Sequence, residues 1–251
     1  LGVTLLGFYQ MAYRISNAPA TEITHVISQV TFPAYSKLQE NIPKLREAYL
    51  KVLQVTAFLS FPIAGLIFVL APDFTEIFLG EKWMPMVPAM QVLAIWGILR
   101  AVGTVGPVAQ AVGKPRIATN IQLVQLIVLA TLIYPLSVRW GILGTSLAVV
   151  FGSLVARLIS SYMVIKITEC RIKSFCRLIA FPLTGTIIMV LPIFFLKMHS
   201  VISIGILEFL MYIGLGILIY LGITYLFDRF LNYKMELIIR DSLYSLGNPF
   251  I

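Results

Sequence analysis

The chain has 251 residues, of which 59% are hydrophobic and only 12% are charged. Its mean hydropathy is +0.93, whereas about a quarter of the residues in an average soluble domain are charged. These values exclude an ordinary soluble domain and predict a helical protein that crosses a membrane several times. The net charge of +8 indicates no nucleic-acid partner, because the basic residues lie in short loops between apolar runs, where they report orientation in the membrane.

The segment 9–36 is apolar enough to enter a membrane, but one side of it is polar. Successive residues lie 100° apart around a helix, which gathers its polar residues into a narrow stripe. The stripe consists of Gln10, Arg14, Asn17, Thr21, His25 and Ser28, with Glu22 at its edge. A charge at mid-helix costs about 2.5 to 3.5 kcal/mol, whereas each Ile, Val or Leu returns only about 0.3 to 0.6 kcal/mol. The stripe must therefore face protein or water.

Six further apolar segments are long enough to cross a hydrocarbon core about 30 Å thick. They are 52–70, 86–112, 117–138, 141–165, 178–196 and 202–227. The connector 37–49 is charged and is expected to turn at Pro43, while the connector 71–85 is expected to rest on the membrane surface. The sequence thus predicts an all-α transmembrane helical bundle of about seven spans. Residues 228–251 are predicted to form a cytoplasmic amphipathic tail.

The loops differ strongly in positive charge. Alternate connections share one side of the membrane, and one of the two sides has only three basic residues, Lys82, Arg139 and Lys197. Three more basic residues lie inside spans, namely Arg14, Arg100 and Arg157, which leaves thirteen of the nineteen Lys and Arg residues on the other side. The positive-inside rule assigns that basic side, and with it the C-terminus, to the cytoplasm.

Packing signals distinguish the spans from one another. Small residues recur at every fourth position of 141–165 and predict a buried wall against which another backbone packs closely. They are Gly144, Ala148, Gly152, Ala156 and Ser160. The spans 178–196 and 202–227 have few polar atoms and are predicted to be peripheral helices that face lipid. The run GTVGP at 103–107 interrupts its span at membrane depth, which indicates either a hinge or a rigid kink.

Three arginines and one histidine are the candidates for substrate or ion contacts. Arg100 lies near the middle of its span and needs a partner, which is either Glu22 in a structural pair or an anionic substrate. Arg14 and Arg157 lie nearer the span ends, where each either extends to the lipid head groups or contacts substrate. If all three arginines line one space, they form a ladder for an anion crossing the membrane, with phosphate as the natural match for guanidinium.

His25 lies three residues after Glu22 on the same predicted helix. The pair is either an ion- or proton-coupling site, or His25 simply makes a hydrogen bond to a neighbouring helix. Cys170 and Cys176 fall in a predicted cytoplasmic loop, where two free thiols are expected and neither a disulfide nor a metal site. No glycine-rich phosphate loop, nucleophile elbow or zinc spacing occurs, so no enzymatic activity and no cofactor are predicted.

Four stretches in succession resemble a known family. They are GFYQMAYR at 7–14, VTFPAYSKLQ at 30–39, FLGEKWMP at 78–85 and ILRAVGTVGPVAQAVGKPR at 98–116. These stretches resemble the polysaccharide exporters, or Wzx-like oligosaccharide flippases, of the multidrug/oligosaccharidyl-lipid/polysaccharide superfamily, and the resemblance extends to about residue 167. It implies half of a protein with fourteen helices in two lobes around a central cavity.

The resemblance implies a domain organisation that follows the predicted spans. Residues 1–6, which show no initiator Met or signal peptide, would be the tail of a preceding transmembrane helix. Five spans within 7–168 would form the C-terminal lobe helices lining the cavity, two peripheral helices would occupy 169–227, and the tail would follow over 228–251.

The function that the resemblance implies is the movement of undecaprenyl-pyrophosphate-linked oligosaccharide repeat units across the bacterial cytoplasmic membrane by alternating access. The product would be a surface polysaccharide such as O-antigen, capsule or exopolysaccharide. The expected partners are the lipid-linked oligosaccharide, membrane lipids, and a polysaccharide polymerase and chain-length regulator of the same pathway. The expected substrate contacts are chosen by the depth of each residue in the membrane and the helical face on which it lies. They are Arg14, Asn17, Thr21, His25, Arg100 and Arg157.

Three other functions stay open at the level of sequence. A multidrug or small-molecule antiporter of the same superfamily would favour a pocket lined by carboxylates and aromatic residues. A membrane enzyme of polysaccharide assembly would be expected to show acidic catalytic residues or a large external loop, and the predicted external loops are short. A scaffold that does not transport would bind assembly partners without lipid-linked substrate.

Overall fold

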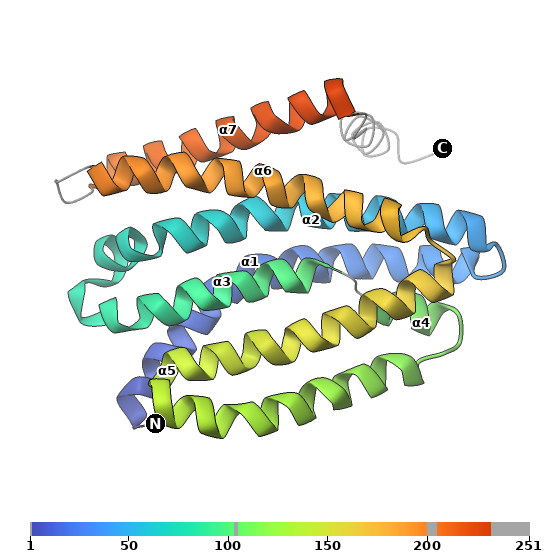
Figure 1. The fold of residues 1–251 in the computed structure, drawn as a ribbon, viewed down its shortest axis with the longest axis horizontal. Helices are drawn as coiled ribbons and strands as arrows, with labels where there is room; N and C mark the ends of the chain where they lie inside the picture. Colours follow the sequence, from blue (N-terminus) through green and yellow to red (C-terminus); the bar gives the residue numbers. More distant parts are fainter. Residues whose placement is uncertain (1, 103–104, 200–204, 232–251) are drawn as a thin grey trace.

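The computed structural model describes residues 2–102, 105–199 and 205–231, and all regular secondary structure within them is helical. The α-helices are α1 (Val3–Leu38), α2 (Ile42–Phe74), α3 (Val87–Ala101), α4 (Val105–Ala111), α5 (Arg116–Thr168), α6 (Ile172–His199) and α7 (Ile206–Leu231). A π-helical turn, η1 (Thr75–Leu79), and a 3₁₀ segment, η2 (Glu81–Met86), join α2 to α3. The long helices run side by side along one axis (Figure 1), and the predicted all-α transmembrane bundle is confirmed.

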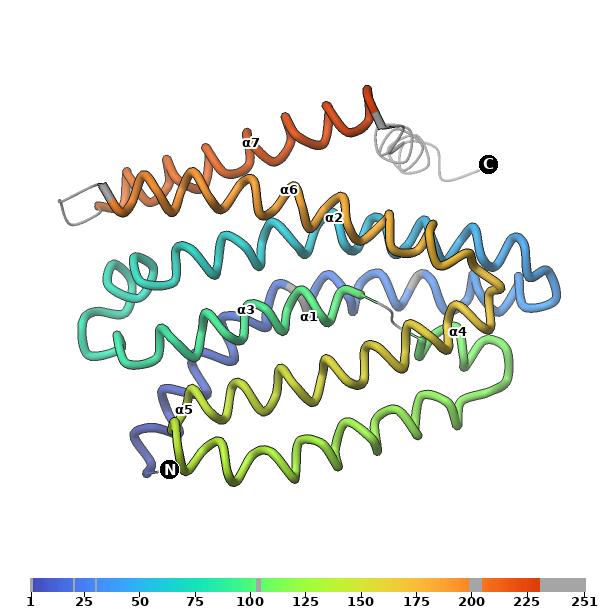
Figure 2. Tube along the Cα trace, viewed as in Figure 1, coloured from blue at the N-terminus to red at the C-terminus, as the bar shows by residue number. Residues whose placement is uncertain are grey.

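Within the described residues, five helical stretches are long and apolar enough to cross a membrane. They are Ile42–Leu79, Glu81–Ala111, Arg116–Thr168, Ile172–Met198 and Ile206–Phe230. One of them, α5, has 53 residues and would extend about 80 Å if straight. The chain doubles back within α5 (Figure 2), because Gly141 adopts φ 59° and ψ −133° and separates two arms. The predicted turn between the spans 117–138 and 141–165 is therefore present.

The first helix is long but less apolar than the other long helices. α1 has 36 residues. Because of its polar stripe, it is not among the five stretches that are apolar enough to cross a membrane. Residues 3–6 form its first turn, so they are not the tail of a separate preceding helix as the sequence analysis predicted. The physical reason is that only Gly7 stands between them and residue 8, and one helical glycine costs about 1 kcal/mol relative to Ala, too little to end a helix.

Both connectors that flank the second span are more helical than expected. α2 begins at Ile42, because Pro43 occupies the first turn of the helix, where its missing N–H costs nothing. The side chain of Asn41 caps this helix by accepting a hydrogen bond from Lys44 N at 3.1 Å. The prediction that Pro43 marks a turn is therefore wrong. At the other end α2 continues to Phe74, so part of the predicted surface connector 71–85 is helix.

The predicted span 86–112 is broken into α3 and α4. Val102 leaves the helix with extended backbone angles, φ −96° and ψ 136°. Pro107 then lies in the first turn of α4, where a residue without an N–H is tolerated. The predicted span therefore consists of two shorter helices.

Burial confirms the predicted roles of the later helices. All five small residues of the stripe in α5 are buried, and Gly152 lies opposite the first arm, where a Cβ would be 3.5 Å from the carbonyl oxygen of Gln125. The most apolar 18-residue segments of α6 and α7 are only 28% and 17% buried, whereas the corresponding segment of the stretch that contains α2 is 56% buried. The first arm of α5 is thus covered by a wall of small residues, while α6 and α7 are peripheral. The predicted tail lies outside the described residues beyond residue 231.

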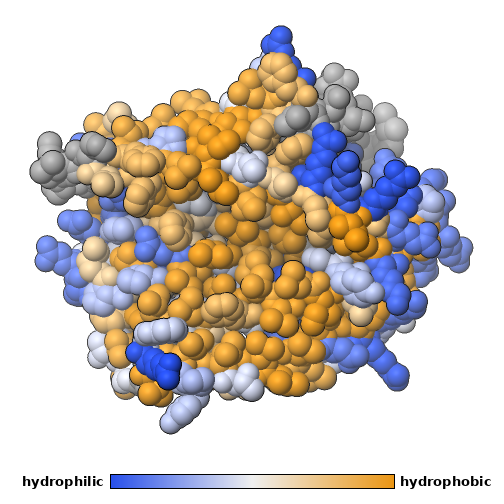
Figure 3. All heavy atoms as spheres, viewed as in Figure 1, coloured by the Kyte–Doolittle hydropathy of each residue, from blue (hydrophilic) through white to orange (hydrophobic). Residues whose placement is uncertain are grey.

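The surface of the bundle separates into an apolar middle and polar ends. Figure 3 shows hydrophobic residues across the middle of one face and hydrophilic residues at both ends of the long axis. The end that carries the α1–α2, α4–α5 and α5–α6 connections is named the basic end (Figure 1). It exposes Lys37, Lys44, Lys114, Arg116, Arg171 and Lys173. An apolar belt between two polar ends is the surface expected of a multi-pass membrane protein.

Candidate functional site

Arg100 lies in the last turn of α3 and is held by three helices. Its Nη1 donates a hydrogen bond to Asn17 Oδ1 on α1 at 3.1 Å, and its guanidinium lies over the ring of Trp96, 5.3 Å from the ring centroid. The indole Nε1 of Trp96 donates in turn to Ser153 Oγ on α5 at 2.5 Å. α1, α3 and α5 therefore fix the position of this guanidinium through neutral groups.

The predicted pair between Arg100 and Glu22 is not formed. Glu22 is exposed on α1, and within the described ranges the structure shows no ion pair between the two residues. The reason is geometric, since Asn17 and Glu22 are five residues apart and point about 140° away from each other around the helix. Arg100 faces Asn17 and keeps an uncompensated positive charge.

Arg157 brings a second guanidinium to the same region. It lies on the second arm of α5, close enough to Arg100 and to the phenol of Tyr49 to interact with both electrostatically. Its Nε atom and the Tyr49 Oη atom are both buried, and neither has a hydrogen-bond partner among the residues that the structure describes. In the part of the chain that the structure describes, no carboxylate lies within salt-bridge distance of either arginine. Two positive charges thus converge without an acidic neighbour.

The remaining predicted site residues lie on α1. Thr21 donates to the Asn17 carbonyl oxygen at 2.9 Å and to Asn17 Oδ1 at 3.0 Å, so these two residues form one polar group beside Arg100. Arg14, Glu22 and His25 are exposed on the same helix. The structure therefore brings together Asn17, Thr21 and Arg100, with Arg157 near Arg100, and places the other three on the exposed surface of α1. No hydrogen bond joins Glu22 to His25 among the contacts that the structure describes.

The two arginines lie beside the break between α3 and α4. Beyond the break, the backbone N–H of Val105 donates to Ser160 Oγ at 3.2 Å, so the stripe of small residues in α5 also anchors the start of α4. Discontinuous helices in transporters commonly build substrate and ion sites, because they place helix ends and polar groups at membrane depth. The location of the arginines fits such a site.

The sequence analysis did not identify two members of this site. Tyr49 lies at the end of the predicted charged connector 37–49, whereas the structure buries its side chain inside α2. Trp96 lies four residues before Arg100, and this spacing places the two side chains on the same face of a helix. That spacing is a signal the sequence analysis did not use.

The site offers no obvious ligand set for a metal. Within the described residues, no three or more His, Cys, Asp and Glu side chains lie together. Cys170 is buried, Cys176 is exposed, and both are free thiols.

Comparison with known proteins agrees with this architecture. Residues 1–88 match the sequence profile of a family described as "Polysaccharide biosynthesis protein". The lipopolysaccharide biosynthesis protein WzxC of Escherichia coli (strain K12) is 28% identical over 167 residues, which cover 66% of this chain and 34% of WzxC. The teichuronic acid biosynthesis protein TuaB of Bacillus subtilis (strain 168) is 39% identical over 101 residues, 40% of this chain and 21% of TuaB. The chain is thus similar, over part of its length, to proteins of polysaccharide biosynthesis.

Two further proteins are similar to this chain. An "uncharacterized membrane protein in cps region" of Klebsiella pneumoniae is 28% identical over 167 residues, 66% of this chain and 34% of that protein. Among solved structures, the lipid II flippase MurJ in an inward closed conformation superposes with a TM-score of 0.70 at 18% identity, over 90% of this chain and 48% of MurJ. That likeness shows a shared fold. The chain spans about a third of the length of the Klebsiella and WzxC proteins.

Proposed function

We propose that this chain forms one lobe of a flippase that moves polyprenyl-pyrophosphate-linked oligosaccharide units across the bacterial cytoplasmic membrane for surface polysaccharide synthesis. The second lobe would correspond to the part of MurJ that this chain does not cover. Transport would proceed by alternating access, with the cavity between the lobes opening to each side of the membrane in turn.

The observation that carries the proposal is the pair of uncompensated arginines. An ion moved out of water without a partner costs several kcal/mol. Arg100 and Arg157 lie near each other beside a helix break, and among the described residues no carboxylate lies within salt-bridge distance of either. A pyrophosphate would supply the missing negative charge, and a guanidinium group can bind it through two parallel hydrogen bonds. The same two charges would repel a cationic drug, which disfavours the multidrug antiporter alternative.

The exposed face of α1 supports the location of a cavity. Arg14, Glu22 and His25 are exposed there, next to the half-buried Asn17 and Thr21. Charged and amide groups are costly against lipid, so this face would line the water-filled space between the two lobes. Asn17 and Thr21 would bind sugar hydroxyls, and Glu22 with His25 would be the groups that couple an ion to transport.

The test compares two arginines in the complete flippase. Arg100→Gln removes the charge but keeps a side chain that can donate to Asn17, and Arg139→Gln removes the charge of an exposed residue beside the turn of α5. Losing a hydrogen bond between charged groups costs about 1.5–3 kcal/mol. We therefore expect Arg100→Gln to lower surface polysaccharide export about 10- to 100-fold and Arg139→Gln to leave it unchanged.

Export would be measured in cells that lack their own flippase, with the amount of each variant in the membrane checked by immunoblot. Normal export by Arg100→Gln at normal protein level would contradict the proposed site. Loss of drug resistance, with polysaccharide unaffected, in a strain without the protein would favour the antiporter instead.

A further inference from the structure

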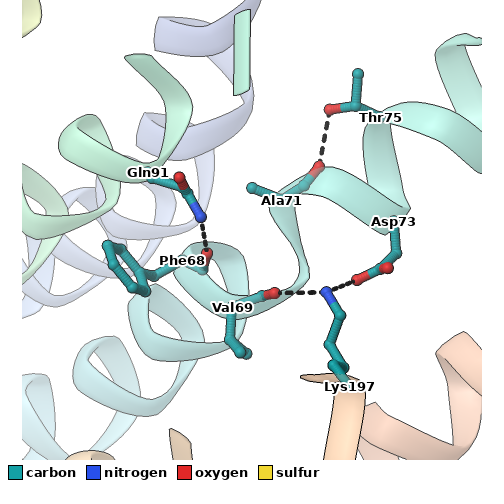
Figure 4. Close-up of polar contacts among 7 residues, drawn as sticks. All are labelled: Phe68, Val69, Ala71, Asp73, Thr75, Gln91 and Lys197. Carbon is teal, nitrogen blue, oxygen red and sulfur yellow. Dashed lines mark hydrogen bonds and ion pairs between the residues drawn. The ribbon is translucent and has the colours of Figure 1, made fainter. Parts of the chain in front are cut away.

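A second polar cluster lies away from the arginines, near the end of α2 opposite the basic end (Figure 4). Pro72 has no N–H, so the Phe68 carbonyl oxygen lacks its usual helical donor. Gln91 of α3 supplies one, because its Nε2 donates to Phe68 O at 3.1 Å. Just beyond, α2 passes into the π-helical turn η1, and Thr75 Oγ1 donates to Ala71 O at 2.8 Å. The end of α2 is thus locally distorted and presents backbone oxygens to its neighbours.

Lys197 reaches this distorted end from α6. Its Nζ donates to Val69 O at 3.0 Å and forms an ion pair with Asp73 Oδ2 (Figure 4). The Lys197 and Asp73 side chains are only 15% and 9% exposed. This pair is largely buried, and both the Asp73 carboxylate and the Val69 carbonyl oxygen bind its ammonium group.

That arrangement has the chemistry of a monovalent-cation site. Alkali cations prefer oxygen ligands, and transporters often coordinate them with carbonyl groups at the C-terminal ends of distorted helices, where the helix dipole is negative. The ammonium of Lys197 carries the same single positive charge as an alkali ion. Because the ammonium group is covalently part of α6, it stays beside α2 at any external salt concentration.

We propose that the Asp73 end of α2 is a monovalent-cation site whose resident cation is the Lys197 ammonium group. The site also explains how the peripheral pair of helices is attached, because Lys197 links α6 to α2 through a charge as well as through apolar contacts. Removing the ammonium leaves Asp73 and the Val69 carbonyl oxygen as a vacant site that a sodium or potassium ion from solution can enter. This inference does not depend on the proposed transport function.

The experiment measures thermal unfolding of the complete purified chain in detergent, in sodium, potassium or choline chloride at equal ionic strength. Wild-type protein should unfold at the same temperature in all three salts. Lys197→Ala should unfold at a lower temperature in choline chloride, and sodium or potassium should raise its midpoint by at least about 2 °C in a saturable manner, since a ligand that binds only the folded state stabilises it.

Two control variants decide the interpretation. The double variant Asp73→Asn/Lys197→Ala should lose the cation dependence, because the carboxylate is gone. Lys82→Ala removes an exposed lysine from η2 and should behave like wild type. Equal midpoints of Lys197→Ala in sodium, potassium and choline chloride, or an equal cation effect in the double variant, would overturn the proposal.

If Lys197→Ala does not fold in any salt, Lys197→Gln replaces it in the same series. Its amide can still donate to Val69 O but carries no charge, and the same outcomes apply. A midpoint that rises with sodium or potassium supports the site, and a midpoint independent of the cation refutes it.

Discussion

Gly144 offers a direct test of how the two arms of α5 pack. A Cβ atom placed on Gly144 would overlap the carbonyl oxygen of Leu136 in the first arm and would lie 3.1 Å from Ser137 N. These are backbone atoms that cannot rotate away, so Gly144→Ala must push the arms apart. Overpacking of this kind typically costs about 1–3 kcal/mol. We expect a value near 2–3 kcal/mol, because neither obstructing atom belongs to a flexible side chain.

Gly152 is the matched control two turns further along the same arm. A Cβ there would lie 3.5 Å from the Gln125 carbonyl oxygen and 3.7 Å from Leu129 Cβ, which is ordinary van der Waals contact. Alanine also favours a helix over glycine by about 0.5–1 kcal/mol. Gly152→Ala should therefore leave the stability unchanged or raise it slightly.

The assay is thermal unfolding of purified wild type and both variants, followed by tryptophan fluorescence in one detergent. At about 2–4 °C per kcal/mol for a chain of this size, Gly144→Ala should lower the midpoint by about 4–12 °C. A Gly144→Ala midpoint equal to that of wild type, or an equal loss in both variants, would refute the close approach of the arms at Gly144.

Three further predictions concern other parts of the chain. Maleimide at neutral pH should label the exposed Cys176 before Cys170, because burial raises the pKa of the Cys170 thiol and keeps it in the unreactive protonated form. Faster labelling of the Cys176→Ser variant, which retains Cys170, than of the Cys170→Ser variant would contradict this. Ser160→Ala should speed hydrogen exchange in α4 and cost about 1–3 kcal/mol of stability, since Val105 N–H loses its acceptor; unchanged exchange in α4 would argue against this role. A cysteine at the exposed Trp140 should react with an impermeant reagent added outside intact cells; labelling only after lysis would reverse the proposed orientation.

The sequence alone predicted the features that depend on local signals. Hydropathy and the helical period indicated an all-α membrane bundle, and the turn at Gly141 followed from a charged and glycine-containing break between two apolar runs. The regular spacing from Gly144 to Ser160 predicted a buried wall, because side chains four residues apart share one face of a helix. The low polarity of α6 and α7 likewise predicted their peripheral position.

The ends of the helices were harder to predict from the sequence, because a proline occurs both in turns and in the first turn of a helix. Pro43 was expected to mark a turn but starts α2, and Pro107 lies in the first turn of α4. A proline is compatible with a turn and with the first turn of a helix. Only the packing of each segment against its neighbours decides between the two.

Side-chain partners were decided by the tertiary structure. A helical wheel gives the face of each helix, but not the rotation of one helix against another. Arg100 could therefore be expected to reach Glu22, whereas α1 presents Asn17 to it. The convergence of Arg100 with Arg157 and the burial of Lys197 beside Asp73 depend likewise on how distant segments are arranged in space. Hydropathy acts along the chain and can be read from it, while the pairing of polar groups depends on kinks and helix rotations that form only when the whole bundle packs.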